Sequence, residues 1–181
     1  MKIGIVGSSG KNGGKINFSM YHKMQRLAMH NISTLAKGAD VTLVSGGAAL
    51  ADHIAIDLFL EGKVSKLILY FPCQWNEKKC EFSAVSSKTN KGEVGHFANK
   101  LHKNFSAQVG NKNSLKDIQD AIDKGAQVII GNGFYGRNTL LAQNVNAMIA
   151  FTFEKKMTPG TQHVWNQCAI DPSQKVHLLI N

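Results

Sequence analysis

The chain has 181 residues and a mass of 19.7 kDa, with 43% hydrophobic and 18% charged side chains. These values are typical of one soluble globular domain and exclude a disordered tail. No apolar run approaches the roughly 20 residues that cross a bilayer, so a membrane-spanning protein is excluded as well.

Charge is distributed unevenly along the chain. The total of 21 Lys+Arg against 12 Asp+Glu gives a net charge of +9. Residues 1–40 hold six basic and one acidic side chain, and residues 71–112 hold seven and three. A basic surface of this kind binds nucleotides, nucleic acids or other polyanions, or it serves solubility alone. Both interpretations stay open at this point.

Localisation is inferred from the N-terminus and the cysteines. The apolar stretch 3–6 ends at Gly7 and is too short for the apolar core of a secretory signal. The three cysteines are an odd number, which is usual in a reducing compartment. We therefore expect a cytoplasmic protein without a membrane partner.

Short apolar runs alternate with amphipathic stretches along the whole chain. The apolar runs predict strands at 2–6, 41–44, 67–71, 127–130, 147–153 and 176–180. The amphipathic stretches predict helices at 19–37, from the Gly46-Gly47 turn through 60, at 114–124, 139–145 and 161–169, with Ser114 as an N-cap and Asp117 in a capping box. This alternation is typical of an α/β fold with right-handed crossovers. We expect a Rossmann-like three-layer sandwich with a mostly parallel sheet, as a single domain over 1–181.

A long polar insert at about 73–113 interrupts this alternation. It is rich in Lys, Asn and Ser, has weak periodicity, and is too long for an ordinary connection. It is either a functional loop or lid, or a partly helical excursion that covers an edge of the sheet. It also holds two cysteines and two histidines, of which only the histidines have the spacing of common zinc fingers, so no metal is expected: Cys73, Cys80, His96 and His102.

Four turns rich in glycine and hydroxyl groups follow predicted strands. Such turns meet beyond the carboxyl ends of a parallel sheet, where ligands bind. Glycine lets the backbone approach a phosphate, and helix N-termini favour anions. One such turn is ordinary, but four at one edge favour a phosphate-bearing ligand: Gly7-Ser8-Ser9-Gly10, Ser45-Gly46-Gly47-Ala48, Gly131-Asn132-Gly133 and Thr158-Pro159-Gly160-Thr161.

Two nucleotide-binding motifs are nevertheless excluded. The run 10–15 resembles a P-loop, but Ser9 stands where the first glycine is needed and Ile16 where Ser or Thr binds Mg²⁺. The turn after the first strand is G-x-x-G and lacks the G-x-G-x-x-G pattern of dinucleotide-binding proteins. The sequence therefore favours neither a kinase nor a dehydrogenase, and no cofactor is expected.

Three motifs in order along the chain resemble those of the SLOG superfamily of Rossmann-like proteins. The first is Ser45-Gly46-Gly47-Ala48-Ala49-Leu50-Ala51-Asp52 with Ala55, which is similar to S-G-G-A-x-G-x-D-x-x-A. The second, Arg137-Asn138-Thr139-Leu140-Leu141-Ala142, resembles the R-N-x-x-[IL]-A helix start of the DprA/Smf group. The third is the last long apolar run followed by Pro159-Gly160-Thr161. The resemblance covers most of the chain apart from the insert.

The resemblance implies a site for a nucleotide or nucleic-acid phosphate near Gly46, Gly47, Arg137 and Thr161. Arg137 would be a permanent cation with a planar fork for phosphate, and Asn138 would fix the loop or the ligand. Backbone N–H and hydroxyl groups would come from the turns. The expected binding residues are Gly7, Ser8, Ser9, Ser45, Gly46, Gly47, Gly131, Asn132, Arg137, Asn138, Gly160 and Thr161.

The chain departs from this family pattern at two positions. LOG-type phosphoribohydrolases carry a glutamate three residues after the threonine of their P-G-G-x-G-T turn, where this chain has Val164. Leu50 replaces the last glycine of the S-G-G-A-x-G part of the first motif. The catalytic pair of a hydrolase is therefore incomplete, and Asp52 is the carboxylate that we nominate for catalysis.

The sequence thus leads to one main hypothesis and several alternatives. The main hypothesis is a protein that binds or senses a nucleotide without turnover. The first alternative is a nucleoside 5′-phosphate N-glycosidase that uses Asp52, and the second is DprA-like binding of single-stranded DNA. Aromatic residues in and beside the insert could stack on bases: Phe71, Trp75, Phe82, Phe97 and Phe105. A scaffold without ligand and a homo-oligomer also stay open.

Overall fold

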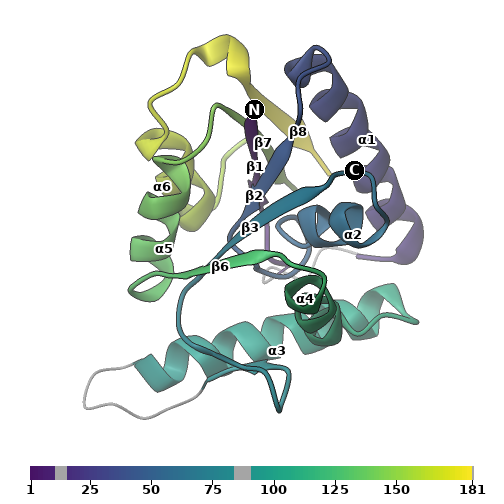
Figure 1. Cartoon of the computed structure of the whole chain (residues 1–181), viewed down its shortest axis with the longest axis vertical. Coiled ribbons are helices and arrows are strands. Elements are labelled where there is room, and N and C mark those ends of the chain that lie inside the picture. Colours follow the sequence, from purple (N-terminus) through teal and green to yellow (C-terminus); the bar gives the residue numbers. More distant parts are fainter. Residues whose placement is uncertain (11–15, 84–90, 181) are drawn as a thin grey trace.

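A computed structural model of the chain describes residues 1–10, 16–83 and 91–180. Residues 11–15 of the P-loop-like run and residues 84–90 of the insert lie outside the described residues. The core is a six-stranded sheet in the order β6-β3-β2-β1-β7-β8, and every neighbouring pair is parallel (Figure 1). The strands are β1 (Lys2–Gly7), β2 (Thr42–Ser45), β3 (Lys66–Phe71), β6 (Gln127–Ile130), β7 (Ala147–Thr152) and β8 (Lys175–Leu179).

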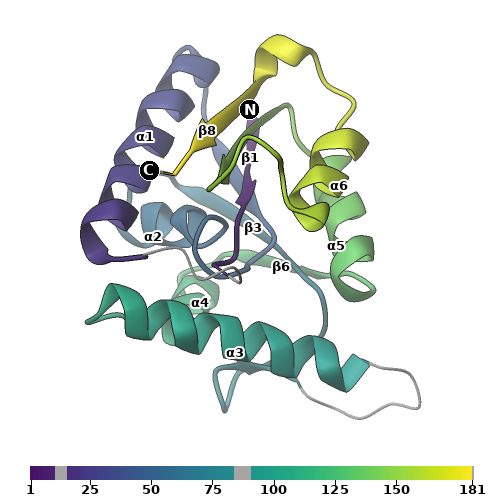
Figure 2. The ribbon, with the colours of Figure 1, turned by 180° about the vertical axis from the view of Figure 1, so that it is seen from behind.

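Helices cover both faces of the sheet and make three layers. Helices α1 and α2 lie on one face with α4 packed against α2, and α5 and α6 lie on the other (Figures 1 and 2). The expected α/β three-layer sandwich is confirmed. The helices are α1 (Phe18–Ala36), α2 (Ile54–Leu60), α3 (Lys91–Val109), α4 (Ser114–Asp123), α5 (Gly133–Ala142), α6 (Pro159–Gln167) and the 3₁₀ turn η1 (Pro172–Gln174). None of the helices in the described part of the chain is long and apolar enough to cross a membrane.

The two faces of the sheet explain why its strands are nearly continuous apolar runs. Every residue of β7 is buried. In β1, Ile3 and Ile5 belong to the larger core beneath α1 and α2, while Val6 belongs to the smaller core beneath α5 and α6. A parallel sheet covered on both faces needs apolar side chains on both sides of each strand.

The insert contains a short antiparallel hairpin and a long helix. The hairpin pairs β4 (Trp75–Asn76) with β5 (Glu81–Phe82), and α3 has 19 residues. Helix α3 runs across the molecule beyond the carboxyl ends of the strands (Figures 1 and 2). The described part of the insert is therefore partly helical, and α3 lies over the carboxyl edge of the sheet.

The starts of α5 and α2 and the N-cap of α4 differ from the expectation. Helix α5 begins at Gly133 instead of residue 139, so the Gly131-Asn132-Gly133 turn leads directly into it. Helix α2 begins at Ile54, after a series of tight turns. The N-cap of α4 is Asn113 rather than Ser114, because the Asn113 side chain accepts from the N–H of Lys116 at 3.2 Å. Asp117 consequently lies outside the capping box.

Candidate functional site

A cavity of about 450 Å³ lies at the carboxyl ends of β1 and β7. In the sheet, β1 lies between β2 and β7. From β1 the chain first adds β2, β3 and β6 on one side, and then adds β7 and β8 on the other side. This is the point where the strand order reverses, and ligands of open α/β sheets bind there. The cavity is lined by Val6, Gly7, Ser8, Ser9, Ala48, Asp52, Phe97, Leu101, Phe134, Tyr135, Arg137, Asn138, Leu141, Thr158, Pro159, Gly160, Thr161 and Val164.

The structure brings most of the expected binding residues to this cavity. Seven of the twelve line it, together with Asp52, the residue nominated for catalysis: Gly7, Ser8, Ser9, Arg137, Asn138, Gly160 and Thr161. The other five do not line it: Ser45, Gly46, Gly47, Gly131 and Asn132. These five residues belong to two turns, whose backbone groups form hydrogen bonds within the protein.

The backbone of the Ser45–Ala48 turn binds the protein's own side chains. The N–H of Gly46 donates to Oδ2 of Asp52 at 3.2 Å, and the N–H of Gly47 donates to Oγ of Ser45 at 3.1 Å. The Ser45 hydroxyl in turn donates to the carbonyl of Asp52 at 2.7 Å. The N–H groups that were expected to bind a phosphate are therefore already paired, with the Asp52 carboxylate in the place of an anion.

Asp52 is a buried carboxyl on the cavity wall. Desolvation raises its pKa above the ordinary value, although Arg137 and backbone N–H groups of Ala48, Gly46 and Gly7 act in the opposite direction. Its Oδ2 lies 3.8 Å from Nη1 of Arg137. The carboxyl of Asp52 therefore keeps its proton to a higher pH than the carboxyl of a surface aspartate.

Arg137 extends from α5 behind the glycine turns. Its Nη1 donates to the carbonyl of Gly46, while its buried Nε–H has no acceptor among the described residues. Cβ atoms on Gly46 and Gly131 would overlap the Arg137 side chain and backbone. These two glycines therefore make room for the arginine, which explains their presence without a bound phosphate. Burial lowers the pKa of Arg137, while Asp52 raises it.

The Gly131–Gly133 turn connects the end of β6 to α5 and lies against the end of β3. The N–H of Gly131 donates to the carbonyl of Phe71 at 2.7 Å, and that of Gly133 to the carbonyl of Pro72 at 3.0 Å. Its N–H groups are thus used within the protein, as in the Ser45–Ala48 turn.

The N-terminus of α6 faces the cavity with polar groups. Thr158 and Thr161 lie with their hydroxyl oxygens 3.0 Å apart, and Nδ2 of Asn138 donates to the carbonyl of Gly160 at 3.2 Å. The first N–H groups of a helix have no partner inside the helix, and the helix dipole favours an anion there. In contrast to the turns at 45–48 and 131–133, whose N–H groups are paired within the protein, this helix start retains the features of an anion site.

Aromatic residues line the cavity beside these polar groups. Phe134 and Tyr135 come from the first turn of α5, and Phe97 comes from α3. Phe134 and Tyr135 were not among the residues expected from the sequence. They could have been selected because they lie between Gly133, in an expected binding turn, and Gly136, just before Arg137. In contrast, Phe71, Phe82 and Phe105 are at most 1% exposed and belong to the core.

His102 on α3 is held by the turn behind the cavity. Its Nε2 lies 3.0 Å from the carbonyl of Gly47, so this nitrogen carries the proton, and its Nδ1 lies 3.1 Å from Oγ of Ser114. Desolvation, followed by the nearby His53, lowers its pKa from 6.5 to about 3. Both ring nitrogens have protein partners, so His102 is not placed as a zinc ligand.

A second group of ionisable side chains lies between α1, α2 and α4. The donor atoms of His53, Asp57 and Asp117 lie within 4.8 Å of one another. Nζ of Lys112 lies 2.7 Å from Asp57 and 2.9 Å from Asp117, so an ammonium occupies the position of a cation. Asp57 also accepts from the Tyr21 hydroxyl at 2.7 Å. The geometry is that of a paired charge network.

Comparison with known proteins gives one informative match. No family model matches the chain, and no solved structure matches it significantly. The chain is 35% identical over 188 residues to "Uncharacterized protein R261" of Acanthamoeba polyphaga mimivirus. The match covers 99% of this chain and 97% of the viral protein. The chain therefore belongs to the same family as this mimivirus protein.

Proposed function

We propose that the protein binds a nucleotide, or the phosphate of a nucleic acid, in the cavity at the carboxyl ends of β1 and β7. One observation carries this proposal: the N-terminus of α6 and the buried Arg137 border the same cavity at the point where the strand order reverses. The phosphate would lie at the N-terminus of α6, between Ser8, Ser9 and Thr161. The net charge of +9 agrees with an anionic ligand.

Asp52 limits where the phosphate can lie. Its carboxylate already accepts from the Ser45–Ala48 turn, so a phosphate at that turn would meet a like charge. A ligand that places its phosphate at α6 would present neutral hydroxyl groups to Asp52. In a nucleotide the sugar lies between the phosphate and the base, so its hydroxyl groups would lie near Asp52 when the phosphate lies at α6.

Binding is tested by thermal shift and calorimetry on the full chain. The compounds are nucleoside mono-, di- and triphosphates, cyclic nucleotides and oligo-dT. A ligand at a hundred times its Kd adds about 2.7 kcal/mol to the free energy of unfolding. Stabilisation by mononucleotides supports a nucleotide-binding protein, and stabilisation by oligo-dT alone, with strong salt dependence, supports nucleic-acid binding. No effect of any compound contradicts the proposal.

Arg137→Lys tests the arginine without removing its charge. Truncation to alanine would leave a space beside Gly46 and Gly131 and endanger the fold, so lysine is the better variant. Lysine lacks the planar fork, and we expect at least tenfold weaker binding. Arg26→Lys, at the exposed second arginine of the chain, is the matched control and keeps its affinity. Equal affinities for both variants would remove Arg137 from the binding site.

Hydrolysis of an N-glycosidic bond is the second candidate function. It is favoured by Asp52, a carboxyl with a raised pKa on the cavity wall, which suits proton transfer to a leaving base. Val164 lines the cavity at the position of the glutamate in LOG-type enzymes and supplies no second carboxylate. We therefore rank hydrolysis below binding.

Asp52→Asn separates the two candidates. If the protein is a hydrolase, the wild type releases free base from a nucleoside 5′-phosphate, and the variant loses this release while it still binds the ligand. Chromatography detects the base and calorimetry the binding. Undiminished release by Asp52→Asn would exclude Asp52 from the mechanism, and no release by the wild type leaves binding as the function.

A further inference from the structure

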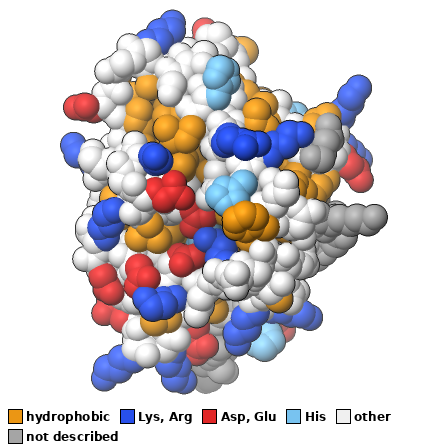
Figure 3. Space-filling view, turned by 90° about the vertical axis from the view of Figure 1, so that its right-hand side faces the viewer, with side chains coloured by type: hydrophobic (Ala, Val, Ile, Leu, Met, Phe, Trp, Pro, Cys, Tyr) orange, Lys and Arg blue, Asp and Glu red, His pale blue; other side chains and the backbone are white. Residues whose placement is uncertain are grey.

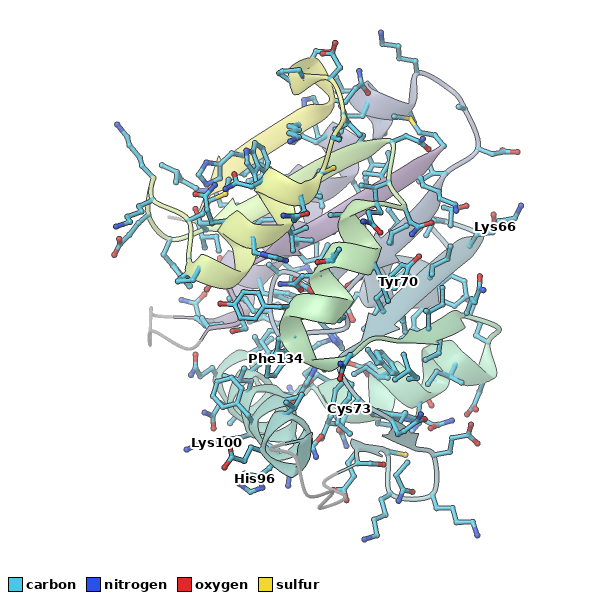
Figure 4. The ribbon with its side chains drawn as sticks, turned by 90° about the vertical axis from the view of Figure 1, so that its left-hand side faces the viewer. Lys66, Tyr70, Cys73, His96, Lys100 and Phe134 are labelled. Atoms are coloured by element: carbon cyan, nitrogen blue, oxygen red, sulfur yellow. The ribbon has the colours of Figure 1, made fainter. Side chains whose placement is uncertain are left out.

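One part of the cavity wall is formed by aromatic rings. Phe97 on α3 and Phe134 on α5 lie with their ring centroids 5.9 Å apart and their planes at 82°. Tyr135 contacts the His163 ring at 5.0 Å. Figure 4 shows Phe134 between the start of α5 and α3, with His96 and Lys100 on the outer side of α3. The insert and the sheet domain thus build this wall together.

Two of these rings are far more exposed than aromatic residues of a core. Phe97 is 36% exposed and Tyr135 is 59% exposed, whereas Phe105 on the same α3 is 1% exposed. Large apolar side chains that line a cavity while reaching solvent mark a place where a ligand is bound. Because the planes of Phe97 and Phe134 are nearly perpendicular, a flat ligand would stack on the face of one ring and contact the edge of the other.

The aromatic part of the wall has few groups that could read the edge of a base. Among the lining residues beside Phe97 and Phe134 are Leu101 and Ala48, whose side chains form no hydrogen bonds. Tyr135 contributes a hydroxyl there. The polar lining residues come from the turns after β1, β2 and β7 and from α5 and α6. Recognition of a base at this wall therefore depends on the ring faces.

Helix α3 is fixed in place before any ligand arrives. The side chain of Asn99 accepts from the N–H of Phe82 and donates to its carbonyl, each at 2.9 Å. Three residues further on, His102 is hydrogen-bonded to Gly47. Phe97 and Leu101 are one helical turn apart, so both are directed to the cavity. A ring held by a rigid helix binds a ligand at low entropic cost.

We propose that Phe97, Phe134 and Tyr135 form a stacking platform for a nucleobase, so that the ligand is a nucleoside phosphate recognised by the face of its base. This inference rests on the proposed function. Stacking tolerates every base because each has a π-face. The larger purine ring covers more of the platform than a pyrimidine, so purine nucleotides bind more tightly than pyrimidine nucleotides, and both bind more tightly than a base-free sugar phosphate.

The test is calorimetry on the full chain with four compounds: adenosine 5′-monophosphate, uridine 5′-monophosphate, ribose 5-phosphate and inorganic phosphate. For the wild type we expect affinity to fall in that order. Phe97→Ala weakens binding of both nucleotides by roughly ten- to a hundredfold and leaves ribose 5-phosphate unchanged. Phe97→Trp, which keeps a π-face, retains nucleotide binding.

Phe18→Ala is the matched control, because Phe18 is an aromatic residue on α1 that is 59% exposed and does not line the cavity. It leaves all four affinities unchanged. Melting temperatures of the variants show that each is folded. Ribose 5-phosphate that binds as tightly as the nucleotides, or nucleotide binding that is indifferent to Phe97→Ala, overturns the platform while the proposed function stands. Absence of binding by every phosphate compound, oligo-dT included, overturns both.

Discussion

Leu50 has a backbone conformation that usually belongs to glycine. Its φ is 62°, in the left-handed region, and its side chain is completely buried. A residue with a Cβ has a cost of about 1–2 kcal/mol in this conformation. In the motif that this segment resembles, the same position is a glycine. The leucine therefore combines a strained backbone with a buried side chain that offsets the strain.

Substitution of Leu50 measures these two effects separately. Leu50→Ala removes the buried side chain but keeps a Cβ, and we expect about 2–5 kcal/mol of destabilisation. Leu50→Gly removes the strain as well, so it should be about 1 kcal/mol more stable than Leu50→Ala. Denaturant unfolding of both variants gives the comparison.

Leu58, which is 2% exposed within α2, is the control position. There the glycine variant should be less stable than the alanine variant by about 1 kcal/mol, because glycine is a poor helix residue. The same order at Leu50 would show that its left-handed backbone is not strained.

For the glycines and Asp52, the sequence predicts their location in the fold but not their contacts. The glycine after each strand correctly marks the edge of the sheet where the cavity lies. Sequence could not show that Gly46 and Gly131 make room for Arg137, or that Asp52 accepts from the turn behind the cavity. Both facts depend on contacts between residues that are six to 91 positions apart.

At the scale of elements, the strands of the central sheet were predictable, whereas α3 and the start of α5 were not. Each of the six strands of the central sheet was predicted within one residue at each end, because buried parallel strands are continuous apolar runs. The apolar positions of α3 do have helical spacing: Val94, Ala98, Leu101, Phe105 and Val109. That pattern is obscured in the sequence because two further positions of the buried face are polar, Asn99 and His102. The start of α5 was missed because its first four residues include two glycines.

Helix packing depends in part on the charge network around Lys112. This lysine precedes α4 and pairs with Asp57 of α2 and Asp117 of α4. The side chains are 14%, 9% and 23% exposed. Figure 3 shows acidic side chains gathered on the side of the molecule where α1 and α2 lie, close to basic ones. Although burial raises the pKa of Asp117, hydrogen bonds from His53 and Lys112 hold it below the ordinary value.

Lys112→Met should therefore destabilise the protein. It leaves two partly buried carboxylates without their ammonium partner, and we expect a loss of about 2–3 kcal/mol, less than for a fully buried pair. Lys116→Met is the control, because Lys116 and its partner Asp120 on α4 are 61% and 42% exposed. Such an exposed pair contributes little, so this variant should unfold like the wild type. Equal unfolding curves for both variants would contradict a structural role of the network.

At the scale of the whole molecule, stability should depend on pH through His102. Its pKa is lowered to about 3, so between that pH and 6.5 the unfolded chain binds a proton that the folded chain does not. The free energy of unfolding then falls as the pH falls, by about 1.4 kcal/mol per pH unit. Asp52 acts in the opposite direction, because with a raised pKa the folded chain keeps a proton that the unfolded chain has released.

A comparison with His102→Gln isolates the histidine from the other titrating groups. The glutamine amide can donate to the Gly47 carbonyl but does not titrate, so the variant lacks this source of acid sensitivity. Between pH 7 and pH 5 we expect the stability difference between wild type and variant to change by about 2 kcal/mol in favour of the variant, measured by denaturant unfolding. His96→Gln, exposed on the same α3, should follow the wild type. A difference that is constant over this range would mean that His102 is protonated equally in the folded and unfolded chains, and the hydrogen bond that joins α3 to the cavity turn would then survive acid.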